Sequence, residues 1–125
     1  MKKKAVETNL VAAPTNPFSL GIIANGFLFV SGQVGKDSNG KVVEGFEAQV
    51  RQTMENLRAI ITAAGAEMDD AVKLTIYVTD ISRIGQMNAI YREYFSEPLP
   101  ARATVEVSKL GLTAEIEIDA IVLVE

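Results

Sequence analysis

The last two predicted strands, 102–107 and 115–123, carry residue types that can do chemistry. Polar side chains alternate with apolar ones along both strands: Arg102 and Thr104 on the first, and Glu115, Glu117 and Asp119 on the second. If the strands pair as a hairpin, their apolar residues share the core face, and the arginine lies among three carboxylates on the other face. Such a face suits the binding of a small carboxylate and the transfer of protons. It also suits a solvent-exposed set of ion pairs.

The amino acids that are absent narrow this chemistry. The 125 residues include no cysteine and no histidine. Disulfides, thiolate nucleophiles, sulfur-ligated metals and Ser-His-Asp triads are therefore excluded. A metal site made of carboxylates alone would need clustered Asp and Glu residues. Any catalysis must use carboxylates, arginine, lysine, hydroxyls, backbone groups and water.

Length and charge indicate the class of protein. A chain of 125 residues fits a single domain, 1–125, and an apolar fraction of 48% is enough for a core. The net charge of -4 argues against general nucleic-acid binding, and no apolar run is long enough to span a membrane. The basic start Lys2–Lys4 is followed by polar residues at 7–9, so we expect no export signal and a cytoplasmic protein.

The polar strands need a scaffold, which begins with a hairpin. Leu20–Ala24 and Phe27–Ser31 are apolar runs separated by Asn25-Gly26, a dipeptide that favours a type I′ turn. A short strand is expected within 3–8, and 9–19 is expected to be a loop because it contains two prolines.

Two amphipathic helices follow, one on each side of a strand. The first has an apolar stripe, and Gly65 is placed to end it; the stripe is Phe46, Val50, Met54, Leu57 and Ile61. Residues 72–79 alternate as a strand does. Ser82 can cap the second helix, which Pro98 and Pro100 end; its stripe is Ile84, Met87, Tyr91 and Tyr94.

The resulting order, ββαβαββ, predicts the fold class. Strand–helix–strand connections of this length normally form right-handed parallel crossovers. Two crossovers and two hairpins predict an α+β fold, with a single mixed six-stranded sheet and two helices on one face. The other face carries Lys73, Thr75, Tyr77 and one side of Phe27–Val30. A second subunit covers this face, or it stays half exposed to solvent.

Several motifs resemble those of the RidA (YjgF-like) family. Pro100-Ala101-Arg102 begins a segment that matches the family signature as far as Ile116-Glu117-Ile118, with the family's spacing between arginine and glutamate. Ser31-Gly32-Gln33 also matches, as does Asn88 followed by Tyr91, Tyr94 and Phe95. The similarity extends over residues 14–124.

The resemblance implies both a fold and an activity. The fold is chorismate-mutase-like, and the assembly is a homotrimer with sites in the clefts between subunits. The activity is the cofactor-free hydrolysis of 2-iminobutanoate and 2-iminopropanoate to 2-oxo acids and ammonia. Arg102 matches the residue that binds the substrate carboxylate, and Glu117 matches the residue that activates water. Ser31, Gly32 and Asn88 match substrate-binding positions.

One position departs from the family. The pocket tyrosine of the family is replaced in Pro17-Phe18-Ser19 by phenylalanine. Phe18 can keep an aromatic wall for the substrate, but it lacks a hydroxyl that can form hydrogen bonds. It also fits a plain loop-packing role.

Three other classes of function share features with this pattern. A protein that binds a small carboxylate metabolite without turnover would use the same pocket, and the missing hydroxyl favours it. A ribonuclease, an activity attributed to some relatives, is disfavoured by the acidic charge and the lack of histidine. A chorismate mutase, which has the same fold, needs several cations around a dianion, and only Arg102 is evident in the signature.

Overall fold

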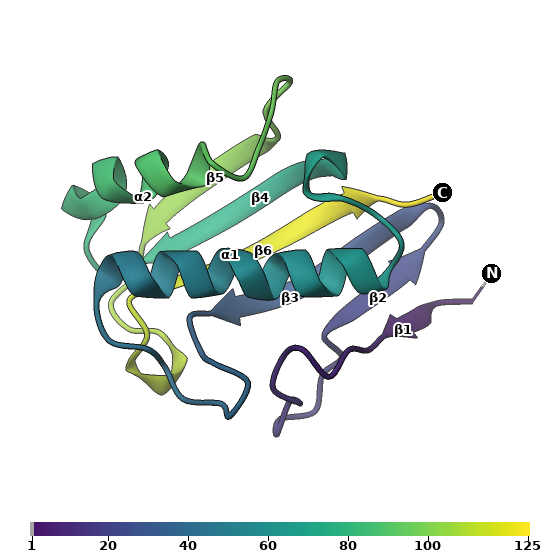
Figure 1. The fold of residues 1–125 in the computed structure, drawn as a ribbon, viewed down its shortest axis with the longest axis horizontal. Coiled ribbons are helices and arrows are strands. Elements are labelled where there is room, and N and C mark those ends of the chain that lie inside the picture. Colours follow the sequence, from purple (N-terminus) through teal and green to yellow (C-terminus); the bar gives the residue numbers. More distant parts are fainter. Residues whose placement is uncertain (1) are drawn as a thin grey trace.

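The computed structural model describes residues 2–125, which form a six-stranded sheet and two α-helices (Figure 1). The strands are β1 (Lys4–Val6), β2 (Gly21–Ala24), β3 (Phe27–Val34), β4 (Ala71–Val78), β5 (Ala101–Glu106) and β6 (Ile116–Leu123). The helices are α1 (Phe46–Ala63) and α2 (Ile84–Tyr91). Three single-turn 3-10 helices are η1 (Met68–Asp70), η2 (Ile81–Arg83) and η3 (Gly111–Thr113).

The first hairpin forms where the sequence predicts it. Asn25 and Gly26 have positive φ angles of 53° and 82°, as a type I′ turn requires, and Ala24 pairs with Phe27. Strand β3 continues past Ser31 to Val34. This extension brings the Ser31-Gly32 pair into the middle of the sheet.

Helix α1 covers the core and ends as predicted. Its apolar stripe is buried beneath the sheet. Gly65 adopts a φ of +84°, and the N–H groups of Gly65 and Ala66 donate to the carbonyls of Thr62 and Ile61 (2.9 and 3.1 Å). This Schellman arrangement satisfies carbonyls that the helix end leaves without partners.

The second helical segment differs from the prediction at both ends. Asp80, and not Ser82, caps the segment where it begins, at η2: its carboxylate accepts hydrogen bonds from the backbone N–H and the hydroxyl of Ser82 (3.0 and 2.6 Å). The N-cap position of α2 itself is Arg83, which makes no side-chain cap hydrogen bond. The carboxylate accepts two hydrogen bonds there, whereas the hydroxyl of Ser82 is used as a donor. Helix α2 ends at Tyr91, so Tyr94 lies beyond it.

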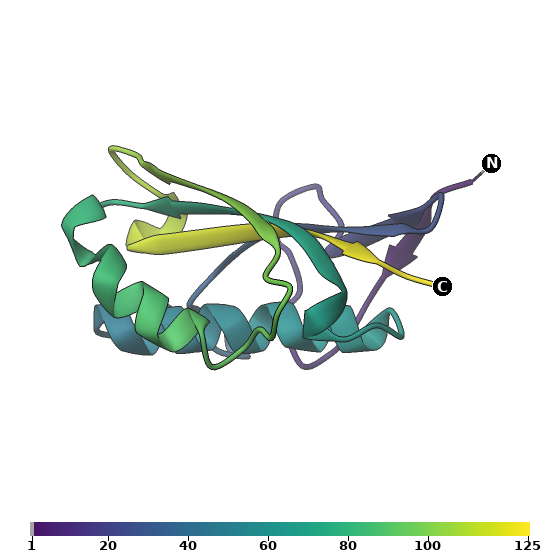
Figure 2. The ribbon, with the colours of Figure 1, turned by 90° about the horizontal axis from the view of Figure 1, so that it is seen from above.

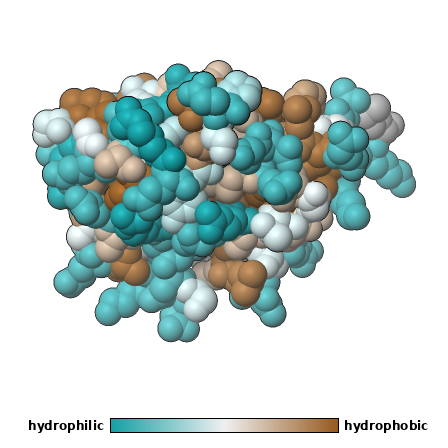
Figure 3. All heavy atoms as spheres, turned by 45° about the horizontal axis from the view of Figure 1, so that its top comes forward, coloured by the Kyte–Doolittle hydropathy of each residue, from teal (hydrophilic) through white to brown (hydrophobic). Residues whose placement is uncertain are grey.

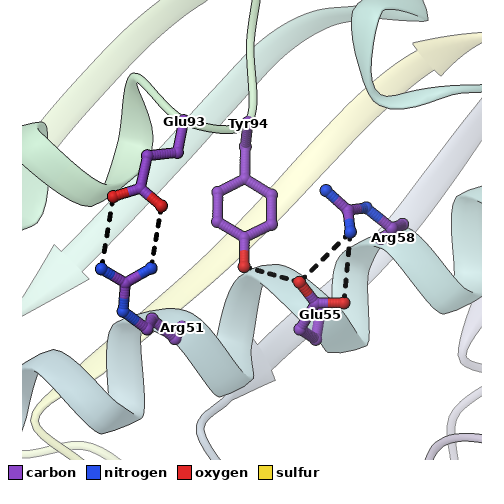
Figure 4. Close-up of polar contacts among 5 residues, drawn as sticks. All are labelled: Arg51, Glu55, Arg58, Glu93 and Tyr94. Atoms are coloured by element: carbon purple, nitrogen blue, oxygen red, sulfur yellow. Dashed lines mark hydrogen bonds and ion pairs between the residues drawn. The ribbon is translucent and has the colours of Figure 1, made fainter.

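Polar contacts tie the segment after α2 to α1 (Figure 4). Both carboxylate oxygens of Glu93 accept hydrogen bonds from the guanidinium of Arg51 (2.9 and 3.2 Å). The Tyr94 hydroxyl donates to Glu55 (2.6 Å), and the Arg58 guanidinium lies 4.8 Å from the centre of the Tyr94 ring. These contacts hold the chain that leads from α2 to β5.

The strand order overturns the second predicted hairpin. The order is β1-β2-β3-β6-β4-β5, so β6 lies between β3 and β4 and is antiparallel to both. Strand β5 lies at the edge of the sheet, where it pairs in parallel with β4 and is not adjacent to β6. The β3–α1–β4 crossover leaves a gap of one strand between β3 and β4, and β6 occupies it. Both predicted parallel crossovers are confirmed.

This order also overturns the predicted grouping of the polar faces. Arg102 and Thr104 are in register with Leu74 and Ile76, whose side chains are buried toward the helices. Glu117 is in register with Tyr77, on the face without helices. Because directly paired residues share a face, Arg102 and Glu117 lie on opposite faces of the sheet.

The predicted α+β fold, with both helices on one face, is confirmed (Figure 2). The other face is uncovered and partly apolar: Phe29, Val105 and Leu123 are exposed by 46%, 41% and 49%. Figure 3 views the molecule with the side of α2 and β5 turned toward the reader. The surface seen there is mostly hydrophilic, with separate hydrophobic patches. Among residues 2–125, neither α-helix is long and apolar enough to cross a membrane.

Candidate active site

Glu117 lies on the uncovered face, near the start of the central strand β6. Its side chain packs over Gly32 of β3 so closely that a Cβ atom on Gly32 would come within 2.8 Å of the Glu117 carboxyl carbon. Only glycine allows this approach. Burial raises the pKa of Glu117, and the negative charge of Asp119 raises it further. A carboxyl group with a raised pKa is a stronger base when ionised than an ordinary carboxylate, which suits it to accept a proton from water.

Ser31 and Gly32 lie in an irregularity of the β3–β6 ladder between Val30 and Gln33. The Ser31 hydroxyl donates to the Ser19 carbonyl (2.6 Å), and its backbone N–H donates to the Leu20 carbonyl (2.9 Å). These bonds join β3 to the end of the 9–19 loop. The hydroxyl oxygen keeps its lone pairs as acceptors for a ligand.

A cavity of 360 Å³ lies beside Glu117 and has the size of a small-metabolite site. Its lining residues are Asn16, Phe18, Ser31, Gly32, Val34, Lys36, Gly111, Leu112 and Glu117. Phe18 is 48% exposed and also lines a second cavity, of 230 Å³. Lys36 and Leu112 are members that the sequence patterns did not indicate, because Lys36 lies between β3 and α1 and Leu112 lies in the short helix η3, where no periodic pattern exists. The positive φ of Leu112, 59°, is a sign of local strain at this rim.

Arg102 lines a different and smaller cavity, of 120 Å³, with Asn88, Tyr91, Arg92 and Leu99. The Arg102 Nε donates to the Thr104 hydroxyl (2.8 Å), and the guanidinium carbon lies 4.9 Å from the centre of the Tyr91 ring. Within residues 2–125, no carboxylate forms an ion pair with Arg102. The two terminal nitrogens are thus oriented but not used, which suits a ligand carboxylate.

Two buried polar atoms beside Arg102 also lack partners. In the described part of the chain, Asn88 Oδ1 and the Tyr91 hydroxyl are buried and make no hydrogen bond. Burial raises the pKa of Tyr91, so its hydroxyl stays protonated at neutral pH. Buried polar atoms without partners are rare in folded proteins and mark places where a ligand or water binds.

Comparison with known proteins identifies the family. Residues 8–124 match the family described as Endoribonuclease L-PSP. The chain belongs to this family. A RutC family protein of Aquifex aeolicus is 43% identical over 121 residues, which cover 94% of this chain and 97% of the relative. The 2-iminobutanoate/2-iminopropanoate deaminase of Salmonella typhimurium is 38% identical over 122 residues, covering 94% of this chain and 95% of the relative.

Solved structures of the Endoribonuclease L-PSP family share the fold. The crystal structure of a conserved Rid family protein from Yersinia pestis has a TM-score of 0.95 and 40% identity, covering 98% of this chain and 100% of that one. The resemblance to the RidA family that the Arg102 and Glu117 segments carry is therefore confirmed. Some relatives bear the name of a deaminase, whereas others are named only as RutC family members.

In this Endoribonuclease L-PSP family member, the predicted cluster of three carboxylates is reduced to two. Glu115 accepts hydrogen bonds from Arg83 (2.9 Å) and from Gln49 of α1 (3.2 Å). Asp119 stays near Glu117 and accepts a hydrogen bond from the Tyr77 hydroxyl (3.3 Å). The larger cause of the raised pKa of Glu117 is burial, and not a crowd of like charges.

Proposed function

We propose that this chain hydrolyses imines of small 2-amino acids, such as 2-iminobutanoate and 2-iminopropanoate, to 2-oxo acids and ammonia. The observation that carries the proposal is the half-buried carboxylate of Glu117, which packs over Gly32 in a metabolite-sized cavity and has a raised pKa. Relatives named as 2-iminobutanoate/2-iminopropanoate deaminases support the reaction class.

The reaction needs one acid–base group and a positioned water. Water adds to the C=N carbon of the protonated imine while Glu117 accepts a proton from that water. Glu117 then passes the proton to the nitrogen of the carbinolamine and, as the C–N bond breaks, accepts the proton of its hydroxyl group. The carbon keeps a carbonyl oxygen, and ammonia leaves with the last proton, which restores the ionised Glu117. The protonated imine is itself a strong electrophile, so these groups suffice for the chemistry.

The substrate carboxylate is assigned to Arg102, which means that the site joins two copies of the chain. In an imino acid the carboxylate is bonded directly to the reacting carbon, so its binding group must lie a few ångströms from Glu117. Within one chain the two residues lie on opposite sheet faces and line separate cavities. We therefore propose a homotrimer in which Arg102 and Asn88 of one copy approach Glu117, Ser31, Gly32 and Phe18 of the next. The uncovered apolar sheet face supports such an assembly.

A specific observation favours a second candidate, a protein that binds carboxylate metabolites without turnover. Phe18 brings an exposed aromatic ring to the cavity but no hydroxyl that could bind water or substrate.

An imine-trapping assay distinguishes the two candidates. An amino-acid oxidase generates the imine in the presence of semicarbazide, and the yield of semicarbazone is followed with and without the purified protein. A deaminase lowers the yield catalytically, at protein concentrations far below that of the imine. A binding protein changes the yield only at concentrations comparable with that of the imine. An unchanged yield with every imine tested would contradict the proposal.

A further inference from the structure

Lys36 brings a positive charge into the cavity that holds Glu117. It follows strand β3 by two residues and lines the 360 Å³ cavity, and its side chain is neither fully buried nor fully exposed. Across residues 2–125 its ammonium group makes no ion pair and no hydrogen bond. A cation without a partner at the wall of a ligand-sized cavity is available to a negatively charged ligand.

The backbone of Lys36 is held firmly, so the side chain starts from a fixed point. The side-chain amide of Asn56, 3% exposed on α1, donates to the carbonyls of Lys36 and Val34 (2.9 and 3.1 Å). Lys36 also forms an isolated antiparallel bridge with Val42. Contacts on two sides make this loop a support for a binding group.

The ammonium of Lys36 is not the partner of either nearby acid. The pKa of Glu117 is raised by burial and by Asp119, whereas a cation beside it would lower that pKa. Asp37, the next residue, uses its carboxylate to accept the N–H groups of Asn39 and Lys41 (2.9 and 3.0 Å). Among residues 2–125, the Lys36 ammonium forms no ion pair with the carboxylate of Glu117, although both residues line the same cavity.

Besides these two charged groups, the cavity is lined by three large apolar residues: Phe18, Val34 and Leu112. A matching ligand has a reacting group near Glu117, a short apolar chain and a negative charge at its far end. We propose that Lys36 binds a side-chain carboxylate of the substrate, so that the preferred substrates are imines of dicarboxylic amino acids, such as 2-iminosuccinate. This inference rests on the proposed imine hydrolysis, and it leaves the carboxylate on the reacting carbon to Arg102.

The first test compares two imines in the trapping assay, 2-iminosuccinate and 2-iminobutanoate. Lys36→Met removes the charge and keeps an unbranched side chain. We expect it to lower the ratio of kcat/KM for 2-iminosuccinate over 2-iminobutanoate by about tenfold, mainly through a higher KM. Lys36→Arg should keep most of the preference. Lys41→Met, which removes an equal charge from an exposed position outside the cavity, is the matched control and should not change the ratio.

A second measurement keeps this inference separate from the proposed function. Succinate and butanoate differ by one carboxylate, and their binding can be measured by calorimetry without any turnover. The wild-type protein should bind succinate more tightly, and Lys36→Met should reduce the difference severalfold. Equal affinities in the wild type, or a preference that survives Lys36→Met, would overturn the role of Lys36. If neither imine is hydrolysed but the succinate preference depends on Lys36, the proposed activity fails and this binding role stands.

Discussion

The side chains of Arg102 and Glu117 project from opposite faces of one sheet. Arg102 is paired in register with Leu74, which is buried against the helices, and Glu117 is paired with Tyr77 on the uncovered face. The carboxylate and the reacting carbon of an imino acid are adjacent atoms, so a single chain cannot present both residues to one substrate molecule. The proposed imine hydrolysis therefore requires a site shared between copies, and this requirement can be tested without a structure of the assembly.

Mixed trimers of two inactive variants should recover activity. Arg102→Met and Glu117→Gln chains carrying different tags are co-expressed, and only assemblies that hold both tags are purified. In a closed trimer with sites between neighbours, about one site in three then combines an intact Arg102 with an intact Glu117. We expect about one third of the wild-type rate per chain. A rate no higher than that of either parent variant would show that both residues act from the same chain.

The purified protein should be a trimer in solution. The uncovered face exposes Phe29 and Leu123, and the rings of Phe27 and Phe29 lie 6.5 Å apart on it. Burying such a surface favours association. Light scattering at micromolar concentration should give close to three times the chain mass of 13.5 kDa. A monomer under these conditions would contradict the shared site as well as the assembly.

Glu117→Gln should affect the chemical step. The amide keeps the shape of the side chain but cannot accept the proton of water, so we expect kcat to fall by roughly 10²–10⁴ while KM changes little. Glu115→Gln is the control. Glu115 belongs to the same alternating set of polar residues as Glu117, but its carboxylate accepts hydrogen bonds from Arg83 and Gln49. Its loss should cost ~0.2–1 kcal/mol of stability with near-normal hydrolysis. Equal loss of kcat in both variants would contradict the assignment of Glu117 as the proton acceptor.

The pH dependence of the reaction should report the environment of Glu117. Only its ionised form accepts a proton, and burial and Asp119 raise its pKa, so kcat should rise with pH through a value above that of an ordinary carboxyl group. Asp119→Asn removes the negative charge that helps to raise the pKa of Glu117, so the rise of kcat with pH should shift to lower pH. While kcat rises with pH, the unfolding free energy should fall. Because the pKa of Glu117 is raised in the folded state, its ionisation destabilises the folded protein as pH rises through that pKa, so Glu117→Gln should be stabilising at neutral pH. If kcat rises at the same pH in Asp119→Asn as in the wild type, the effect of Asp119 on the pKa of Glu117 is contradicted.

Phe18→Tyr tests the position that departs from the family. The ring lines the cavity, and a tyrosine hydroxyl there can form a hydrogen bond with substrate or water. We expect turnover of 2-iminobutanoate to rise or to stay the same, as measured in the trapping assay. Loss of activity in a variant that still forms the wild-type assembly would show that Phe18 does not occupy the role of the tyrosine.

Features set by neighbours along the chain were predictable from sequence. Asn25-Gly26 readily adopts the positive φ angles that a type I′ turn requires, so the first hairpin follows from two residues between two apolar runs. The stripe of α1 and its end at Gly65 follow from helical spacing and a left-handed glycine. The segments of Arg102 and Glu117 identified the family because their residue types and spacing are specific.

Tertiary structure alone decided which faces meet. Alternation has a period of two, so it groups the residues of one strand but does not say which group faces the core. In β5 the apolar residues Ala103 and Val105 lie on the uncovered face, while Arg102 faces the helices at the sheet edge, where no residue of the strand is fully buried. The insertion of β6 between β3 and β4 depends on pairing over long sequence separations. The same pairing brings Gly32 beneath Glu117, and the adjoining loops add Lys36 to their cavity, contacts that no local pattern encodes.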